Sequence, residues 1–141
     1  MDKFISNSEN ETSKIAYDLA STLNTGDILI LSGDLGSGKT HFTKGLLSFW
    51  ELDDEASSPT FTIVNEHHAN NTNIYHFDVY RLSGPGEFEN IGGPEYFENG
   101  ICIIEWGEII KDSLPASYIQ VTIEKDLSSE NVRHISIERK P

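Results

Sequence analysis

An eight-residue motif combines glycines with a lysine and a threonine. Residues 33–40 read GDLGSGKT and fit the pattern G-x-x-x-x-G-K-[ST]. The glycines permit positive φ angles and let backbone amides approach a phosphate closely. Those amides, with the positive end of a helix starting near Lys39, form an anion site. There Lys39 reaches the β- and γ-phosphates and the Thr40 hydroxyl ligates Mg²⁺, so the motif predicts nucleotide binding.

Two carboxylates in apolar strands are candidates to complete a magnesium–phosphate site. Glu105 directly follows the apolar run at 101–104, and a carboxylate that closes a buried strand is costly without a partner. Asp78 lies in the alternating segment IYHFDVY at 74–80. For Asp78 two other interpretations stay open: a solvated strand residue, or a group that orients the attacking water or holds a metal-bound water.

Two features that the sequence lacks limit which nucleotide it is expected to bind and which reaction it is expected to catalyse. The sequence has no [NT]-K-x-D motif, which favours ATP over GTP. Small-molecule kinases of this class carry arginines that clamp the transferring phosphoryl group. The arginines here are Arg81, Arg133 and Arg139, and residues 83–100 contain no Lys or Arg. The acceptor-binding machinery of a kinase is therefore hard to find in this chain.

The remaining candidate residues carry weaker signals. The histidines show no metal-ligand spacing with the lone cysteine, Cys102, which is expected to pack in the core. His67 and His68 are predicted to form an exposed strand end. Trp106, directly after Glu105, packs at the nucleotide site or caps the core, and the residues do not decide between the two.

The elements that must position these residues alternate between helix and strand. Ser8 and Glu11 have the spacing of a capping box, and Ile15, Leu19 and Leu23 repeat as one helical face. The predicted elements, in order, are a helix at 9–23, a strand at 28–31, a helix at 40–50, a strand at 60–64 within a hairpin of 61–67 and 74–80, a loop with short helical turns at 83–100, a strand at 101–104, a short helix at 106–114, and strands at 118–124 and 133–138. This order predicts an α/β domain of the P-loop type with a mixed parallel and antiparallel sheet flanked by helices.

The length and charge of the chain limit the number of domains and the classes of function that are expected. A chain of 141 residues is expected to form a single domain, 1–141, because domains have roughly 100–200 residues. No apolar run is long enough to span a membrane, and the acidic start MDKFISNSENE does not resemble a signal peptide. With a single cysteine, the chain is expected in the reducing cytoplasm. Ten Lys and Arg against 23 Asp and Glu give a net charge of −13, which disfavours direct binding of nucleic acid.

With these residues assembled, the sequence resembles the TsaE family of small bacterial ATPases required for threonylcarbamoyladenosine synthesis in tRNA. The segments that carry the resemblance are GDLGSGKT (33–40), SPTFTIVNE (58–66), IYHFDVYRL (74–82) and ICIIEWGE (101–108), in that order. Ser37 stands where alanine is common in the family, and Val79 where leucine is common; neither touches the proposed chemistry.

The resemblance implies a role for each matching position. The nucleotide-binding residues it implies are Asp34, Leu35, Gly36, Ser37, Gly38, Lys39, Thr40 and, by a weaker match, Arg133. Thr40 and Glu105 would ligate Mg²⁺, and Asp78 would be a catalytic or supporting carboxylate. Thr60, in a switch-like loop, would lie near the γ-phosphate, and Trp106 would affect hydrolysis.

The resemblance also implies ATP and Mg²⁺ as cofactors and the TsaB–TsaD pair as partner, with tRNA contacted only indirectly. That division of labour agrees with the acidic charge of the chain. Two other functions stay open at this point: an independent small-molecule kinase, and a nucleotide-sensing module that docks on a partner without hydrolysing ATP.

Overall fold

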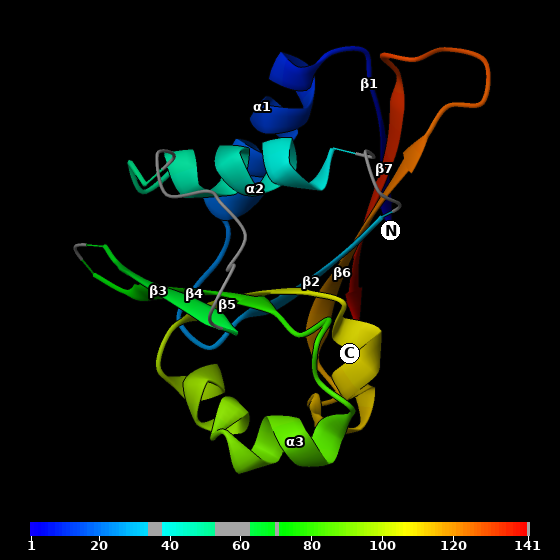
Figure 1. The fold of residues 1–141 in the computed structure, drawn as a ribbon. Helices are drawn as coiled ribbons and strands as arrows, with labels where there is room; N and C mark the ends of the chain where they lie inside the picture. The colour runs from blue at the N-terminus through cyan, green and yellow to red at the C-terminus, as the bar shows by residue number, and fades with distance from the viewer. Residues whose placement is uncertain (34–37, 53–62, 70, 141) are drawn as a thin grey trace. The chain divides into compact units, whose positions relative to one another are not determined.

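The computed structural model describes residues 1–33, 38–52, 63–69 and 71–140 (Figure 1). The elements, in order, are β1 (Asp2–Ser6), α1 (Glu9–Ala20), β2 (Ile28–Gly33), α2 (Lys39–Ser48), β3 (Val64–His68), β4 (Asn73–Asp78), α3 (Pro85–Asn90), the 3₁₀ helix η2 (Gly93–Glu98), β5 (Ile101–Glu105), the 3₁₀ helix η3 (Gly107–Ser113), β6 (Tyr118–Lys125) and β7 (Arg133–Lys140). The described residues form a seven-stranded sheet in the order β1-β7-β6-β2-β5-β4-β3. Its pairings confirm the predicted mixed sheet: β2 and β4 each run parallel to β5, whereas β3 is antiparallel to β4 and β1 to β7.

The chain divides into two compact units. The first contains Met1–Leu23, Ser32–Ser57 and Val121–Glu138, and the second contains Asn24–Leu31, Ser58–Gln120 and Arg139–Pro141. The single-domain organisation stays a prediction. None of the helices in the described part of the chain is long and apolar enough to cross a membrane.

In the first unit, α1 and α2 pack side by side (Figure 1). The Ser8 hydroxyl caps α1 by accepting from the Glu11 amide at 3.1 Å, as the spacing predicts. Gly45 of α2 lies directly against α1, because a Cβ placed there would come within 2.3 Å of the Ser13 carbonyl oxygen. Both helices are shorter than predicted: α1 ends at Ala20 and α2 at Ser48, each continuing into turn hydrogen bonds.

The strand β1 was not expected from the sequence. It pairs antiparallel with β7, Phe4 opposite Ile135, at the edge of the sheet. Only Ser6 of its five residues is buried, so β1 lacks the alternation that reveals β6 and β7 in the sequence.

In the second unit, β2, β5 and β4 build the parallel part of the sheet. The apolar sequences of β2 and β5 are typical of strands buried on both faces, and all five residues of β5 are buried. The predicted hairpin is present as β3 and β4, with Val64 opposite Phe77. Residues 60–62 of the predicted strand lie outside the described residues.

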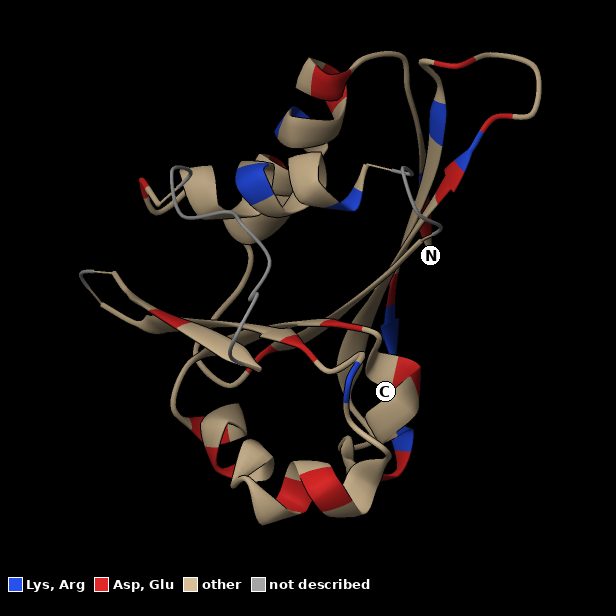
Figure 2. Cartoon of the chain, viewed as in Figure 1, with Lys and Arg blue, Asp and Glu red and all other residues tan. Residues whose placement is uncertain are grey.

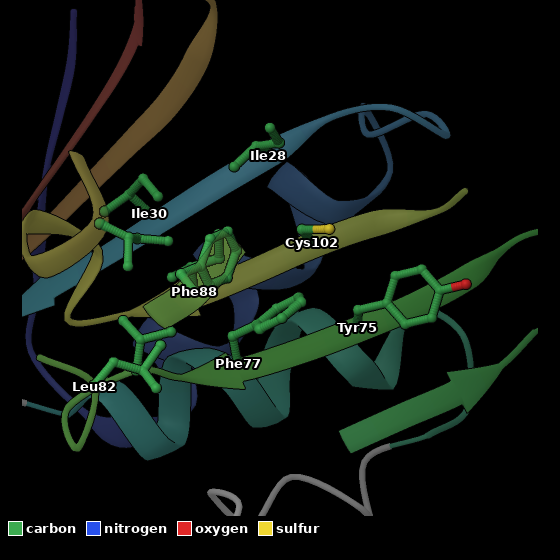
Figure 3. Packing of buried hydrophobic residues seen from close by; sticks show 10 residues of the cluster. Ile28, Ile30, Tyr75, Phe77, Leu82, Phe88 and Cys102 are labelled. Atoms are coloured by element: carbon green, nitrogen blue, oxygen red, sulfur yellow. The ribbon is translucent and has the colours of Figure 1, made fainter. Parts of the chain in front are cut away.

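One face of this parallel sheet carries the hydrophobic core of the second unit (Figure 3). Alternate residues contribute to it: Ile28 and Ile30 from β2, Tyr75 and Phe77 from β4, and Cys102 and Ile104 from β5; Phe88 of α3 and Ile110 of η3 cover this face. By the same alternation, His76, Asp78 and Glu105 lie on the opposite face. The core thereby fixes the direction of every candidate side chain on β4 and β5.

The connection from β4 to β5 contains α3 and η2, as predicted for 83–100. The predicted helix at 106–114 is the 3₁₀ helix η3, with non-helical angles at Ile110. The sequence placed this turn correctly but did not indicate its tighter winding.

Candidate functional site

The start of α2 has the geometry of an anion site. Gly38 is the N-cap, in the left-handed region at φ 106°, where a side chain costs roughly 1–2 kcal/mol. Lys39 and Thr40 are the first two helical residues, so their amides have no acceptor within the helix. Since glycine offers no capping side chain, the positive end of α2 is suited to an anionic group.

The other residues of the phosphate motif that were implied to bind nucleotide, Asp34, Leu35, Gly36 and Ser37, lie outside the described residues. Thr60 also lies outside them. Their implied contacts stay predictions.

Arg133, the first residue of β7, lies beside the motif in the first unit. Its Nε is 3.9 Å from the position a Cβ on Gly38 would occupy. Its guanidinium also donates to the carbonyl oxygens of Glu130, at 2.5 Å, and Val132, at 3.1 Å. These bonds anchor a cation next to Gly38, and its contact with a nucleotide stays a prediction.

In the second unit, Glu105 ends β5 as a buried carboxylate with a histidine partner. Its Oε2 lies 2.7 Å from Nε2 of His76, and His76 itself is completely buried. An ionised carboxylate only accepts hydrogen bonds, so Nε2 of the imidazole is the donor to the ionised form of Glu105. Burying a carboxylate at the end of a strand costs free energy. The hydrogen bond with His76 on the neighbouring strand offsets that cost for Glu105.

Asp78 lies in the same row of the sheet as Glu105. The Cα register pairs Asp78 with Glu105 and Glu105 with Leu31. Asp78 and Glu105 are the last residues of β4 and β5, and Leu31 lies two residues before the end of β2. Adjacent strands are about 4.8 Å apart, so two carboxylates project from neighbouring positions of one face. Asp78 is half-buried, and its Oδ1 accepts from the Tyr80 amide at 3.1 Å. This bond holds the carboxylate at the end of β4, and the role of Asp78 stays a prediction.

Trp106 leaves β5 with an unusual backbone. Its φ of 65° is left-handed, which is uncommon for a bulky residue. Its ring lies 4.8 Å, centroid to centroid, from that of Tyr80, and both side chains are substantially exposed. The two alternatives for Trp106, packing at the nucleotide site and capping the core, both stay predictions.

Two further expectations concern buried groups. Cys102 is completely buried in the core, as predicted, and burial raises the pKa of its thiol to about 12. His67 is also buried, which corrects the prediction of an exposed strand end; His68 alone is exposed. The reason is register: His67 pairs with Ile74, whose row of the sheet is buried.

Sequence reasoning missed His76 and Tyr80. A signal for His76 exists, since it lies two residues before Asp78 in an alternating strand and so shares its face. Nothing local predicts that its ring reaches Glu105, because the two are 29 residues apart and meet only through strand pairing.

The donor set suits a small phosphate-bound cation better than an all-protein metal cage. Among the described residues, no group of three or more His, Cys, Asp or Glu could hold a metal ion. Mg²⁺ at phosphate sites commonly uses one or two carboxylates together with substrate phosphates. Asp78 and Glu105 supply two carboxylates in the row of Leu31, and the phosphate motif begins two residues after Leu31.

A mixed sheet with a glycine-capped helix after its phosphate motif and acidic residues at neighbouring strand ends defines the P-loop NTPase-like class. The crystal structure of Bacillus subtilis YdiB has the same fold: its TM-score is 0.77 at 31% identity, covering 99% of this chain and 86% of that one. The family "Threonylcarbamoyl adenosine biosynthesis protein TsaE" matches residues 6–135. The chain belongs to the TsaE family.

Curated relatives agree with this assignment. The protein named tRNA threonylcarbamoyladenosine biosynthesis protein TsaE from Rickettsia conorii is 41% identical over 119 residues, 84% of this chain and 68% of the relative. The protein of the same name from Bacillus subtilis is 41% identical over 116 residues, 82% of this chain and 72% of the relative. The family places the chain in the biosynthesis of threonylcarbamoyladenosine in tRNA.

Proposed function

We propose that this chain is an ATPase that binds and hydrolyses Mg-ATP in a complex with a TsaB–TsaD pair during tRNA modification. The observation that carries the proposal is the row Leu31–Glu105–Asp78. It aligns a buried, hydrogen-bonded carboxylate and a half-buried one at the ends of parallel strands, two residues before the phosphate motif begins. Ligands of open α/β sheets bind at the carboxyl ends of the strands.

In this proposal, separate residues bind the phosphates, hold Mg²⁺ and orient the attacking water. Lys39, the amides that open α2, and the Arg133 guanidinium neutralise phosphate charge. Thr40 and Glu105 hold Mg²⁺, which neutralises the charge that develops on the phosphates during hydrolysis. Asp78 orients the attacking water, and its bond to the Tyr80 amide holds the carboxylate in place.

The charge distribution supports a partner that handles the tRNA. The segment from α3 to η2 contains Glu87, Glu89, Glu95 and Glu98 and no Lys or Arg, as Figure 2 shows. Phosphate neutralisation by Lys and Arg supplies much of the affinity for nucleic acid, and this segment would oppose it. The chain would therefore act on tRNA only through basic partners, and we place it with them in the cytoplasm.

The proposal is tested by phosphate release from Mg-ATP, measured for the purified chain with and without a TsaB–TsaD pair. We expect the pair to stimulate release and Glu105→Ala to abolish the stimulation. ATP binding without stimulated release would instead support the non-hydrolysing module. Release that depends on a small-molecule acceptor would support the kinase.

A further inference from the structure

His76 is the one completely buried histidine in the described part of the chain. Its Nε2 bonds to Glu105, and its Nδ1 has no hydrogen-bond partner among the described residues. Burying an imidazole with one nitrogen unsatisfied costs free energy that an apolar side chain at this position would avoid. Packing alone therefore does not account for histidine here.

The bond from His76 constrains the orientation of the Glu105 carboxylate. The terminal torsion of glutamate is broad, so a carboxylate without a partner rotates over a wide range. A donor fixed on the neighbouring parallel strand, 2.7 Å from Oε2, restricts that rotation. Because a carboxylate oxygen has more than one lone pair, accepting from His76 does not prevent the group from ligating a metal.

We infer that His76 is a positioning residue that orients Glu105 toward a divalent cation. The inference rests on the proposed function, since it takes Glu105 as a ligand of nucleotide-bound Mg²⁺. Partners that orient metal ligands in this way commonly change metal affinity by about 10- to 100-fold when removed. His76 would thus set the affinity for the cation while touching neither the cation nor the nucleotide.

The test uses glutamine and asparagine at position 76. The amide nitrogen of glutamine reaches about as far as Nε2 and can still donate to Glu105, whereas that of asparagine is one methylene too short. We expect His76→Asn to weaken Mn²⁺ binding to the ADP-loaded chain about tenfold or more, and His76→Gln by less than about threefold. The readout is electron paramagnetic resonance of free Mn²⁺ during titration, which requires no turnover.

Binding of a fluorescent ADP analogue without metal separates positioning from damage to the fold. We expect it to be unchanged in both variants. His67→Asn is the matched control, since His67 is also buried but lies on β3, outside the row of carboxylates. It should leave the Mn²⁺ affinity within about twofold of the unchanged chain.

Equal Mn²⁺ affinity in His76→Asn and the unchanged chain would overturn the inference, as would an equal loss in His76→Gln and His76→Asn. Failure of the proposed function gives a different result: the unchanged chain would then bind Mn²⁺ no better than Glu105→Gln. If His76→Asn does not fold, failure of His76→Gln to keep Mn²⁺ affinity overturns the inference and retained affinity supports it.

Discussion

At the scale of residues, the proposed site combines groups whose chemistry is visible in the sequence with one group, His76, whose proposed role depends on strand pairing. Gly38, Lys39 and Thr40 are recognisable because their spacing is a local property, and α2 begins where the motif places it. Glu105 is recognisable because a carboxylate after four apolar residues is unusual. His76 is not, because its partner is set by strand register rather than by spacing along the chain.

The first prediction separates binding from turnover. Lys39→Ala should abolish ATP binding, because the motif then lacks the charge that reaches the β- and γ-phosphates. Asp78→Ala should bind ATP normally and lose turnover by about a hundredfold or more, the usual effect of removing a group that handles a proton in the transition state. Titration with ATP and phosphate release measure the two effects, and normal turnover in Asp78→Ala would remove this residue from the mechanism.

The second prediction concerns Cys102. Burial raises its thiol pKa to about 12, so at pH 8 only about one thiol in ten thousand is the reactive thiolate. Ellman's reagent should therefore not modify the folded chain at pH 8 but should modify it fully in urea. Because the unfolded thiol ionises near its ordinary pKa, the folded chain should also lose stability as the pH rises from about 9 toward 12. Rapid modification without urea would contradict the burial.

At the scale of elements, the sequence pattern predicts β2 and β5 because they are continuous apolar runs, and β6 and β7 because their buried residues alternate with less buried ones. The helix ends were placed two or three residues too late, because turns continue their hydrogen bonding without helical geometry. The edge strand β1 is not predictable from the sequence pattern because most of its residues are exposed. Tertiary pairing, rather than local preference, decides such elements.

The third prediction tests the contact between α1 and α2. Gly45→Ala should destabilise the chain by about 2 kcal/mol, because the new methyl would lie within 3 Å of Ser13 backbone atoms and of the Ala16 methyl, and crowding of this kind costs 1–3 kcal/mol. Gly86→Ala in α3 is the matched control: nothing lies within 4 Å of its Cβ position, so it should be neutral or slightly stabilising. Urea unfolding measures both, and equal midpoints would contradict the close packing.

At the scale of the whole molecule, the sequence predicted the mixed α/β sheet, and the TsaE family assignment agrees with the phosphate motif. The net charge of −13 predicts a chain that needs a partner to act on tRNA. What the sequence could not supply was the face on which each strand residue lies, because one register sets all of them together. That register puts His76, Asp78 and Glu105 on one face and the aromatic core on the other.

The most direct test of the central claim is the threonylcarbamoyladenosine content of tRNA in bacteria whose own TsaE is replaced by this chain. Quantified by mass spectrometry of digested tRNA, the modification should be restored by the unchanged chain and lost with Lys39→Ala and with Glu105→Ala. The Gly86→Ala variant, which alters no proposed site residue, should restore it fully. Equal restoration by the Lys39→Ala and Glu105→Ala variants would contradict the account, because the chain would then support modification without binding or hydrolysing Mg-ATP.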